Sequence, residues 1–309
     1  MTRFALRRSR LAVASILTLT ALAFTASCGE DTEYRALLDD LTNGSNEKQY
    51  EAAVELGRQK ERRAVDAMTH VIEDDDPYVR EAVAWALGEI GDPAAVESLS
   101  RAAAGDESET VRENAVYSLG QIGDAVAVAP LMEIFLGEAR PNIEAYEAGQ
   151  DEPNPALLAA FSLRRIGAPA IAPLAAAAGD EDLTVRRVAL ATLGEIGLDT
   201  GDYSGVPALT EALSDDEALI RETAAHSLII TGDPASLTGL EAALEAWGTE
   251  RMAGFFLGSG QQQLVEAATA WVQANGLDLE AVRCSVDGRA KWGSFDPKAV
   301  AAGCAGQSG

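Results

Sequence analysis

The residue types that most often carry out catalysis or bind metals are scarce in this chain. It has two histidines, His70 and His226, and they lie far apart in the sequence. A zinc site, or a nucleophile activated by histidine, needs several such residues at suitable spacing. No Gly-x-Ser-x-Gly motif accompanies the serines. The sequence therefore predicts no enzyme activity, no metal site and no cofactor.

Carboxylates are the abundant chemical group, with 49 Asp and Glu against 24 Lys and Arg and a net charge of −25. Nucleic acid is a poor partner for such a chain, because phosphate contacts require clustered Lys and Arg. The charge permits a cationic protein partner, divalent cations at modest affinity, or a saline habitat that requires no function. The acidic runs at 74–76, 180–182 and 215–216 are expected to cap helix N-termini rather than to act as general acids or calcium ligands.

The N-terminal region has the pattern of an export signal. An apolar run from Leu11 to Phe24 is too short for a comfortable membrane span, and basic residues precede it. These are Arg3, Arg7, Arg8 and Arg10. The run ends at Thr25-Ala26-Ser27-Cys28, which resembles the lipobox of bacterial lipoproteins, although that family prefers an aliphatic residue where this chain has Thr25. The resemblance implies that Cys28 is the lipidated first residue of the mature chain. Ordinary signal-peptide cleavage, with Cys28 incidental, is the alternative.

Removal of residues 1–27 would leave a lipidated tether, residues 28–45, before the main body of the chain. We expect this tether to be acidic and mobile, with a short helical pattern that includes Tyr34 and Leu41. No later stretch reaches the roughly 20 apolar residues that a membrane span requires. The expected location is therefore the bacterial cell envelope, with the protein lipid-anchored on the periplasmic or surface face and not spanning the membrane.

Two further cysteines, Cys284 and Cys304, lie near the C-terminus. If Cys28 is lipidated, they form an even pair in a compartment where disulfides persist. A bridge between them would close a loop of about 20 residues and stabilise the tail by about 3 kcal/mol. Two free thiols are the alternative.

The strongest signal is an internal repeat. The segment VREAVAWALGEIGDP, from Val79 to Pro93, recurs from Val111, Val185 and Ile220, with weaker copies at 49–61 and 156–168. The copies end at glycines about 30 residues apart, apart from one longer gap. These glycines are Gly91, Gly123, Gly167, Gly197 and Gly232. A period of this length indicates a stack of supersecondary units that lack a core of their own.

Each copy reads as a helix that is followed by a shorter one. The apolar residues of the first copy recur at helical spacing, and Gly91-Asp92-Pro93 combines a helix stop with a proline suited to the next first turn. The motif resembles the HEAT repeats, and more closely their phycobilisome-lyase-like short variant, over residues 43–245. That resemblance implies an all-α, right-handed superhelix of about six helical hairpins, with first helices outside and second helices lining a concave face.

The arginine of each Val-Arg or Ile-Arg pair invites a binding role, but a structural role is favoured. The resemblance implies that such arginines bond acidic residues of neighbouring turns and so fix the geometry between repeats. The four arginines are Arg80, Arg112, Arg186 and Arg221. The acidic residues available to them are Asp76, Asp92, Asp124, Asp182 and Asp233.

Residues 246–309 are expected to form a C-terminal cap and tail after a repeat domain that spans 46–245. Residues 261–275 carry apolar side chains at helical spacing and end in Asn275-Gly276, a good helix stop. This helix would cover the open end of the stack, and Trp247 and Trp271 suit core positions there, with ligand stacking as the alternative.

Two surfaces are candidates for binding. The first is the insertion at 137–153, which lengthens one repeat and offers Arg140, Asn142, Tyr146 and Gln150, although a passive loop is equally compatible. The second is the concave face implied by the resemblance. Its exposed second-helix residues would be Glu97, Arg101, Glu133, Glu211 and Glu241.

The sequence thus predicts a monomeric, membrane-anchored scaffold for protein interactions in the bacterial envelope, with unknown protein partners. The alternative is an enzyme or lyase-like enzyme subunit with a site in the concave groove. Phycobilisome lyases act in the cytoplasm, and deoxyhypusine hydroxylases need several His-Glu pairs that this chain lacks, so neither activity is expected.

Overall fold

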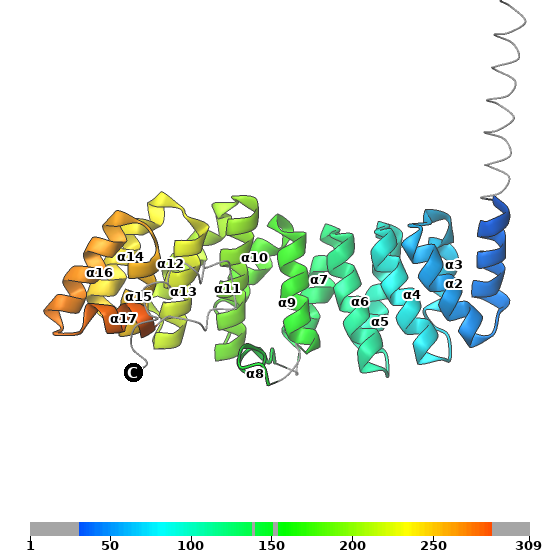
Figure 1. Ribbon diagram of the computed structural model, residues 1–309, viewed down its shortest axis with the longest axis horizontal. Helices are drawn as coiled ribbons and strands as arrows, with labels where there is room; N and C mark the ends of the chain where they lie inside the picture. The colour runs from blue at the N-terminus through cyan, green and yellow to red at the C-terminus, as the bar shows by residue number, and fades with distance from the viewer. Residues whose placement is uncertain (1–30, 138–139, 151–153, 286–309) are drawn as a thin grey trace, which may run out of the picture. The chain divides into compact units, whose positions relative to one another are not determined.

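The computed structural model describes residues 31–137, 140–150 and 154–285, and every regular element in these ranges is helical (Figure 1). The chain divides into two compact units, residues 1–98 and 99–309. The predicted all-α fold of repeated helical hairpins is confirmed.

In the first unit, residues 31–43 are helical, and three further helices follow: α2 (Asn46–Arg58), α3 (Val65–Val71) and α4 (Pro77–Ile90). Helices α2 and α3 both pack against α4. Residues 31–43 of the segment predicted to be a mobile tether are thus helical. Leu41 is fully buried, and the Tyr34 hydroxyl donates a hydrogen bond to the Arg63 carbonyl at 3.0 Å. The helix predicted from the apolar spacing of Tyr34 and Leu41 is therefore part of the folded first unit.

In the second unit, longer first helices alternate with shorter second helices. The first helices are α6 (Glu109–Ile122), α9 (Pro155–Ile166), α11 (Leu183–Thr200) and α13 (Ala218–Thr231). The second helices are α7 (Val128–Phe135), α10 (Ala168–Ala177), α12 (Val206–Glu211) and α14 (Leu237–Trp247). Helix α5 (Val96–Gly105) spans the boundary between the units. Consecutive first helices contact one another in chain order, which forms a continuous layer (Figure 1).

Acidic caps and left-handed glycines set the ends of these helices. The Oδ1 atoms of Asp76 and Asp182 accept hydrogen bonds from the backbone N–H groups of Tyr78 and Thr184, at 2.8 and 2.9 Å. Each bond satisfies an N–H group at the start of α4 or α11 that the helix itself leaves unpaired. The glycines at the ends of α4, α6 and α13 have φ values of 69° to 70°, which residues other than glycine rarely adopt.

The predicted helix end at Gly197 is wrong. Helix α11 continues to Thr200 and ends at Gly201, whose φ is 69°. Gly197 lies inside the helix, where a Cβ atom would approach Thr231 Cγ2 to 2.8 Å. Gly197 therefore allows two helices to pack closely and does not stop one.

Other glycines within first helices have the same packing role. A Cβ atom at Gly120 would lie 2.6 to 2.8 Å from atoms of Ser162, and one at Gly194 would lie 2.7 to 2.9 Å from atoms of Ser227. Real Cβ atoms essentially never make contacts this short. The α6–α9 and α11–α13 packings therefore depend on glycine at these two positions.

The hairpin pattern continues beyond residue 245. Helices α15 (Glu250–Gly258) and α16 (Gln262–Ala274) pack against each other and against α13 and α14, respectively, and α17 (Leu279–Ser285) packs on α15. Phe256 is fully buried in this hairpin, and α16 occupies the position of the predicted cap helix. Trp247 is 53% exposed and so lies outside the core in which it was expected.

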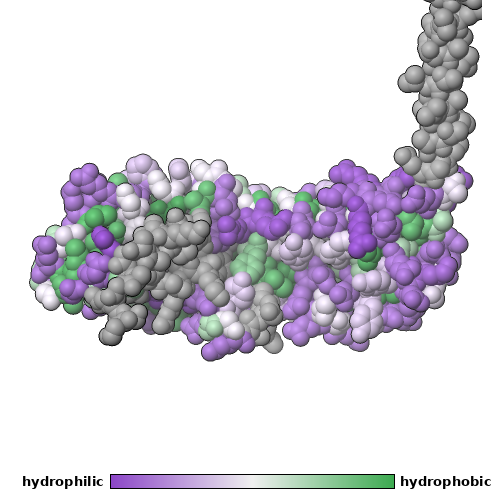
Figure 2. Space-filling view, viewed as in Figure 1, coloured by the Kyte–Doolittle hydropathy of each residue, from purple (hydrophilic) through white to green (hydrophobic). Residues whose placement is uncertain are grey.

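The insertion contains a short helix, α8 (Ile143–Glu147), whose Ile143 side chain is buried. Within the described residues, no helix is both long and apolar enough to cross a bilayer. On the face drawn in Figure 2, hydrophilic residues cover much of the described surface, and hydrophobic patches are small.

Candidate functional site

A groove opens between the second helices α10 and α12 and the turns that follow them, with a volume of about 610 Å³. Small residues, mostly alanines such as Ala175 and Ala208, line part of it. Arg186 is the basic residue of the lining. Its acidic side chains are Asp180, Glu211, Asp215, Asp216 and Glu217. The groove is therefore strongly negative, and most of its acidic residues come from the turn between α12 and α13.

Two of these carboxylates have structural tasks within the turns. Asp180 Oδ1 accepts a hydrogen bond from the backbone N–H of Asp182, and Asp215 Oδ1 accepts one from the backbone N–H of Glu217, both at 2.8 Å. Glu211, Asp216 and Glu217 are exposed, and no side-chain hydrogen bond or ion pair of theirs is present in the described part of the chain. Three negative charges therefore remain open to solvent along the groove.

The four repeat arginines all bind backbone carbonyls of the turn that precedes their own helix. Their Nη1 atoms donate to the carbonyls six and five residues earlier, at distances between 2.7 and 3.3 Å. For Arg186 the acceptors are the Asp180 and Glu181 carbonyls, and for Arg221 they are those of Asp215 and Asp216. A planar guanidinium suits this double acceptor, so each arginine closes an inter-repeat turn.

The carboxylate partner of Arg186 differs from the expected ones. The carboxylate near Arg186 belongs to Asp215, which lies 3.3 Å from Nε, and Asp182 instead lies 3.4 Å from Arg140 Nε. Asp92, Asp124 and Asp233 each cap a 3-10 turn between the two helices of a hairpin, through bonds of 2.8 to 3.0 Å to a backbone N–H group. Asp76 caps α4. The physical reason is local: a carboxylate one residue before a helix meets unpaired N–H groups of its own turn first.

Side chains at the arginine position also reach forward to the next turn. In the first unit Gln49 holds this position, and its Nε2 donates to Asp74 Oδ2 at 3.1 Å. In the second unit Arg186 faces Asp215, and the Arg221 guanidinium lies 5.7 Å from the centre of the Trp247 ring. Trp247 thus occupies the place that Asp74 and Asp215 hold in two other turns.

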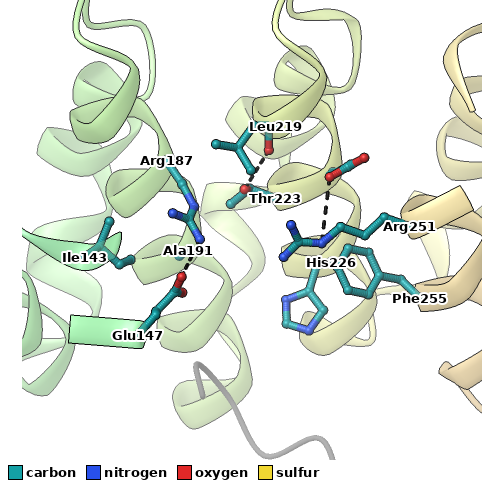
Figure 3. Close-up of a pocket in the computed structure, with 10 residues that line it drawn as sticks. Ile143, Glu147, Arg187, Ala191, Leu219, Thr223, His226, Arg251 and Phe255 are labelled. Atoms are coloured by element: carbon teal, nitrogen blue, oxygen red, sulfur yellow. Dashed lines mark hydrogen bonds and ion pairs between the residues drawn. The ribbon is translucent and has the colours of Figure 1, made fainter. Parts of the chain in front are cut away.

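A second, smaller cavity of about 50 Å³ lies among first helices, between α8, α11, α13 and α15. Figure 3 shows Arg187 and Glu147 pointing towards each other, with Nη2 to Oε2 at 2.7 Å. On the opposite wall Arg251 Nε lies 3.8 Å from Glu222 Oε2. The volume suits a few water molecules and no larger ligand.

His226 lies in the wall of this cavity, with its ring centre 4.8 Å from that of Phe255. Burial, and then the positive charge of Arg251, lower the pKa of His226 to about 4, so the imidazole is neutral at pH 7. No pattern in the sequence pointed to this cavity, because its residues come from four separate elements.

The predicted binding residues of the insertion mostly hold the insertion in place. Arg140 Nη1 donates to the Leu136 and Gly137 carbonyls at 3.1 Å, and Asn142 Oδ1 accepts from the backbone N–H of Asn154 at 2.9 Å. The Tyr146 ring meets the edge of Phe161 at 5.8 Å between centres. Gln150 is exposed. The structure does not bring these four side chains together as a binding site.

A buried acid links α9 to α11. Arg164 stands at the repeat position that Gly120 and Gly194 hold in other first helices. Its Nη1 donates to Glu195 Oε2 and its Nε donates to Asp199 Oδ2, both at 2.7 Å. The Glu195 side chain is 2% exposed, and burial raises its pKa to about 7 despite the opposing effect of Arg164. The pKa of Arg164 is itself raised, chiefly by the hydrogen bond with Asp199. Burial is the largest effect on the pKa of Glu195, and the negative charge of Asp199 adds a smaller effect in the same direction.

This raised pKa has a consequence for stability. Between the ordinary value of 4.5 and about 7, the folded chain keeps a proton on Glu195 that the unfolded chain has released. The contribution of Glu195 to stability therefore falls as pH rises through this window. The difference between the two values corresponds to roughly 3 kcal/mol.

The second-helix candidates belong to several different helices. Glu97, Glu133 and Glu211 are exposed on α5, α7 and α12, and of the candidates only Glu211 lines the groove. Cys28 and Cys304 lie outside the described residues. Cys284, on α17, is disulfide-bonded, and its pairing with Cys304 stays a prediction.

Two family profiles match the sequence. Residues 34–106 match the HEAT repeats, and residues 111–137 match the PBS lyase HEAT-like repeat. These two segments of the chain therefore carry HEAT-type repeats. Both matched segments end before α8, so the residues that line the groove and the smaller cavity lie outside them. No curated protein matches the chain.

Several solved structures are similar to this chain at low identity. They include the CpcE–CpcF complex of phycocyanin lyase from Nostoc sp. PCC7120 (21% identity, 78% of this chain and 94% of that chain, TM-score 0.42) and an archaeal HEAT-like repeats protein from Thermococcus onnurineus NA1 (16%, 83% and 98%, 0.41). Human deoxyhypusine hydroxylase matches with 21% identity, 78% and 83% coverage and a TM-score of 0.32.

Proposed function

We propose that this HEAT-repeat scaffold binds a partner protein in the groove between α10 and α12. The open groove itself carries the proposal. Its volume of about 610 Å³ lies within the usual range of binding sites, and three of its carboxylates are exposed and uncommitted in the described chain. By contrast, Arg140 and Asn142 of the insertion are hydrogen-bonded to nearby backbone groups, and the cavity near His226 is small.

We further propose that lipid on Cys28 anchors the scaffold to a membrane of the bacterial envelope, on its periplasmic or surface face. The basic and apolar residues before Thr25-Ala26-Ser27-Cys28 support this. The described helix begins at residue 31, so a lipid on Cys28 would keep the first unit close to the membrane.

Catalysis is not part of the proposal. His70 lies on α3 in the first unit and His226 lies on α13 in the second. The acidic residues that directly precede helices, such as Asp76 and Asp182, cap those helices by accepting hydrogen bonds from backbone N–H groups. An enzyme or lyase-like enzyme subunit with a site in the same groove is the competing function.

Site-specific photo-crosslinking in envelope preparations tests the binding function. A crosslinking residue in place of Ala208, in the groove, is expected to yield one stoichiometric protein adduct under mild detergent. The same residue in place of Gln263, exposed on α16, is the matched control and is expected to yield none. Absence of any stoichiometric adduct from position 208 would count against a protein-binding groove.

The anchor has a separate test. Cys28→Ser is expected to release the chain from the membrane fraction and to remove the mass of the lipid. An unchanged mass and unchanged fractionation would show that Cys28 is not lipidated.

A further inference from the structure

The residues that line the groove between α10 and α12 carry an excess of negative charge. Five carboxylates face one guanidinium, that of Arg186. This guanidinium donates to the Asp180 and Glu181 carbonyls at 2.9 and 3.1 Å, and its Nε lies 3.3 Å from Asp215 Oδ2. The one basic group of the lining is therefore committed to the fold, and the groove attracts positive charge.

The arrangement of the carboxylates favours a cationic chain over a metal ion. Among the described residues, no group of three or more acidic, histidine or cysteine side chains is placed to hold a metal. Glu211 lies at the end of α12, whereas Asp216 and Glu217 lie in the following turn. Their charges are distributed along the groove, as a ligand with several separated positive charges would require.

The floor of the groove is shaped for a narrow ligand. Ala175, Ala176 and Ala178 line one side, and Ala208 and Ala212 line the other. Methyl groups leave space for a peptide backbone to lie between the two helices, and they offer apolar contact for the aliphatic stems of lysine or arginine.

An exposed aromatic ring lies close to the groove. The Arg221 guanidinium donates to the Asp215 and Asp216 carbonyls at 2.7 and 2.9 Å, and it also lies 5.7 Å from the Trp247 ring centre. Trp247 is 53% exposed, so much of the indole remains open to solvent. A cation over an indole face is attracted by its ring quadrupole, and Trp is the most effective residue for this. The ring thus extends the cation-binding surface beyond the carboxylates.

We propose that this surface binds an extended segment of a partner protein that carries several lysine or arginine residues. One basic side chain lies among Glu211, Asp216 and Glu217, and another stacks on Trp247. This inference rests on the proposed function of the groove and specifies the chemistry of its partner.

Fluorescence anisotropy of the full chain in mild detergent tests the proposal. The probe is a labelled octapeptide of alternating lysine and serine, and the control probe is an octapeptide of alternating glutamate and serine. We expect saturable binding of the lysine peptide, weakened by salt, and no binding of the glutamate peptide. The double variant Asp216→Asn, Glu217→Gln should weaken binding of the lysine peptide by about three- to ten-fold.

A matched variant separates a local site from the general negative charge of the chain. Glu144→Gln with Glu280→Gln removes the same net charge from exposed residues of α8 and α17 and should leave the affinity within about two-fold. Trp247→Leu should weaken binding, whereas Trp247→Phe should retain most of it because phenylalanine keeps a π face.

The outcomes are distinguishable from those of the crosslinking experiment. Equal losses in the two double variants would overturn the local site. A crosslinked partner from position 208, together with no binding of the lysine peptide, would overturn the cationic segment and leave the scaffold function intact. Displacement of the lysine peptide by an equal concentration of spermidine would show a site for free polyamines and would also overturn the proposal.

Discussion

Replacing Gly194 with alanine should destabilise the second unit, because α11 and α13 approach each other too closely to admit a methyl group. A Cβ atom at position 194 would lie 2.7 Å from Ser227 Cβ and 2.9 Å from Ser227 Cα and Oγ. Two of these three atoms belong to the backbone or the first side-chain carbon, so no rotation of the serine relieves the overlap. The two helices must move apart.

The magnitude follows from two opposing effects. Overpacking in a close-packed interior typically costs about 1 to 3 kcal/mol. Alanine in place of glycine within a helix returns up to about 1 kcal/mol through its higher helix propensity. We therefore expect Gly194→Ala to lower the free energy of unfolding by about 1 to 2 kcal/mol.

Gly239 provides the matched control. It also lies within a helix, α14, but a Cβ atom there would meet its nearest neighbours, Thr210 Cγ2 and Leu213 Cδ1, at 3.7 and 3.8 Å. Gly239→Ala gains the same propensity without the overlap and should raise stability by up to about 1 kcal/mol. The two glycine-to-alanine changes thus have opposite predicted signs.

Urea unfolding followed by far-ultraviolet circular dichroism measures both variants. Because repeat stacks do not always unfold in one step, the transition midpoints should be compared together with the slopes. Adding Ser227→Gly to Gly194→Ala should recover part of the loss, since it removes the opposing Cβ atom. If Gly194→Ala proved as stable as Gly239→Ala, the inference that glycine sets the α11–α13 spacing would be refuted.

Three further predictions concern other parts of the fold. The contribution of Glu195 should make the natural chain less stable as pH rises from about 4.5 to 7, and Glu195→Gln should abolish this loss. Urea unfolding of both chains across that range measures the effect, and a difference in stability that does not change with pH would contradict it. Arg186→Lys should lower the unfolding free energy by about 1 to 2 kcal/mol, because one ammonium group cannot contact both the carbonyls of the turn and the Asp215 carboxylate, whereas Arg35→Lys on an exposed position should change it by less than about 0.5 kcal/mol. Protection of Cys284 and Cys304 from alkylation without reductant would support their bridge, and free thiols would exclude it.

The repeat motif was sufficient to predict the all-α fold and the succession of hairpins, because apolar periodicity and Gly-Asp-Pro stops are local signals. The same locality explains the error at Gly197. A glycine that ends a helix and a glycine that admits a neighbouring helix look identical in the sequence, and only the contact with Thr231 distinguishes them. Similarly, the apolar pattern around Leu41 indicated a helix. The burial of Leu41, however, depends on contact with the first repeat, which the pattern does not show.

The candidate site was less accessible to sequence reasoning. The acidic run at 215–216 was visible, and its proximity to a helix start favoured a capping role. That interpretation accounts for Asp215, which bonds the backbone N–H of Glu217. It does not account for the groove, which forms because α10 and α12 lie side by side. The repeat period in the sequence does not show how far apart two second helices lie.

The turn between α12 and α13 carries more negative charge than its backbone uses. Asp215 satisfies one N–H group and faces Arg186, whereas Asp216 and Glu217 contribute only backbone groups to the neighbouring bonds. If the acidic surplus served only to keep the chain soluble, its position would be immaterial, and carboxylates on α8 or α17 would be equivalent to those of the groove. Screening restricts the influence of an exposed charge to about 10 Å at 0.1 M salt. Carboxylates gathered around one groove therefore act on what enters that groove, and the comparison of the two double variants measures this local effect directly.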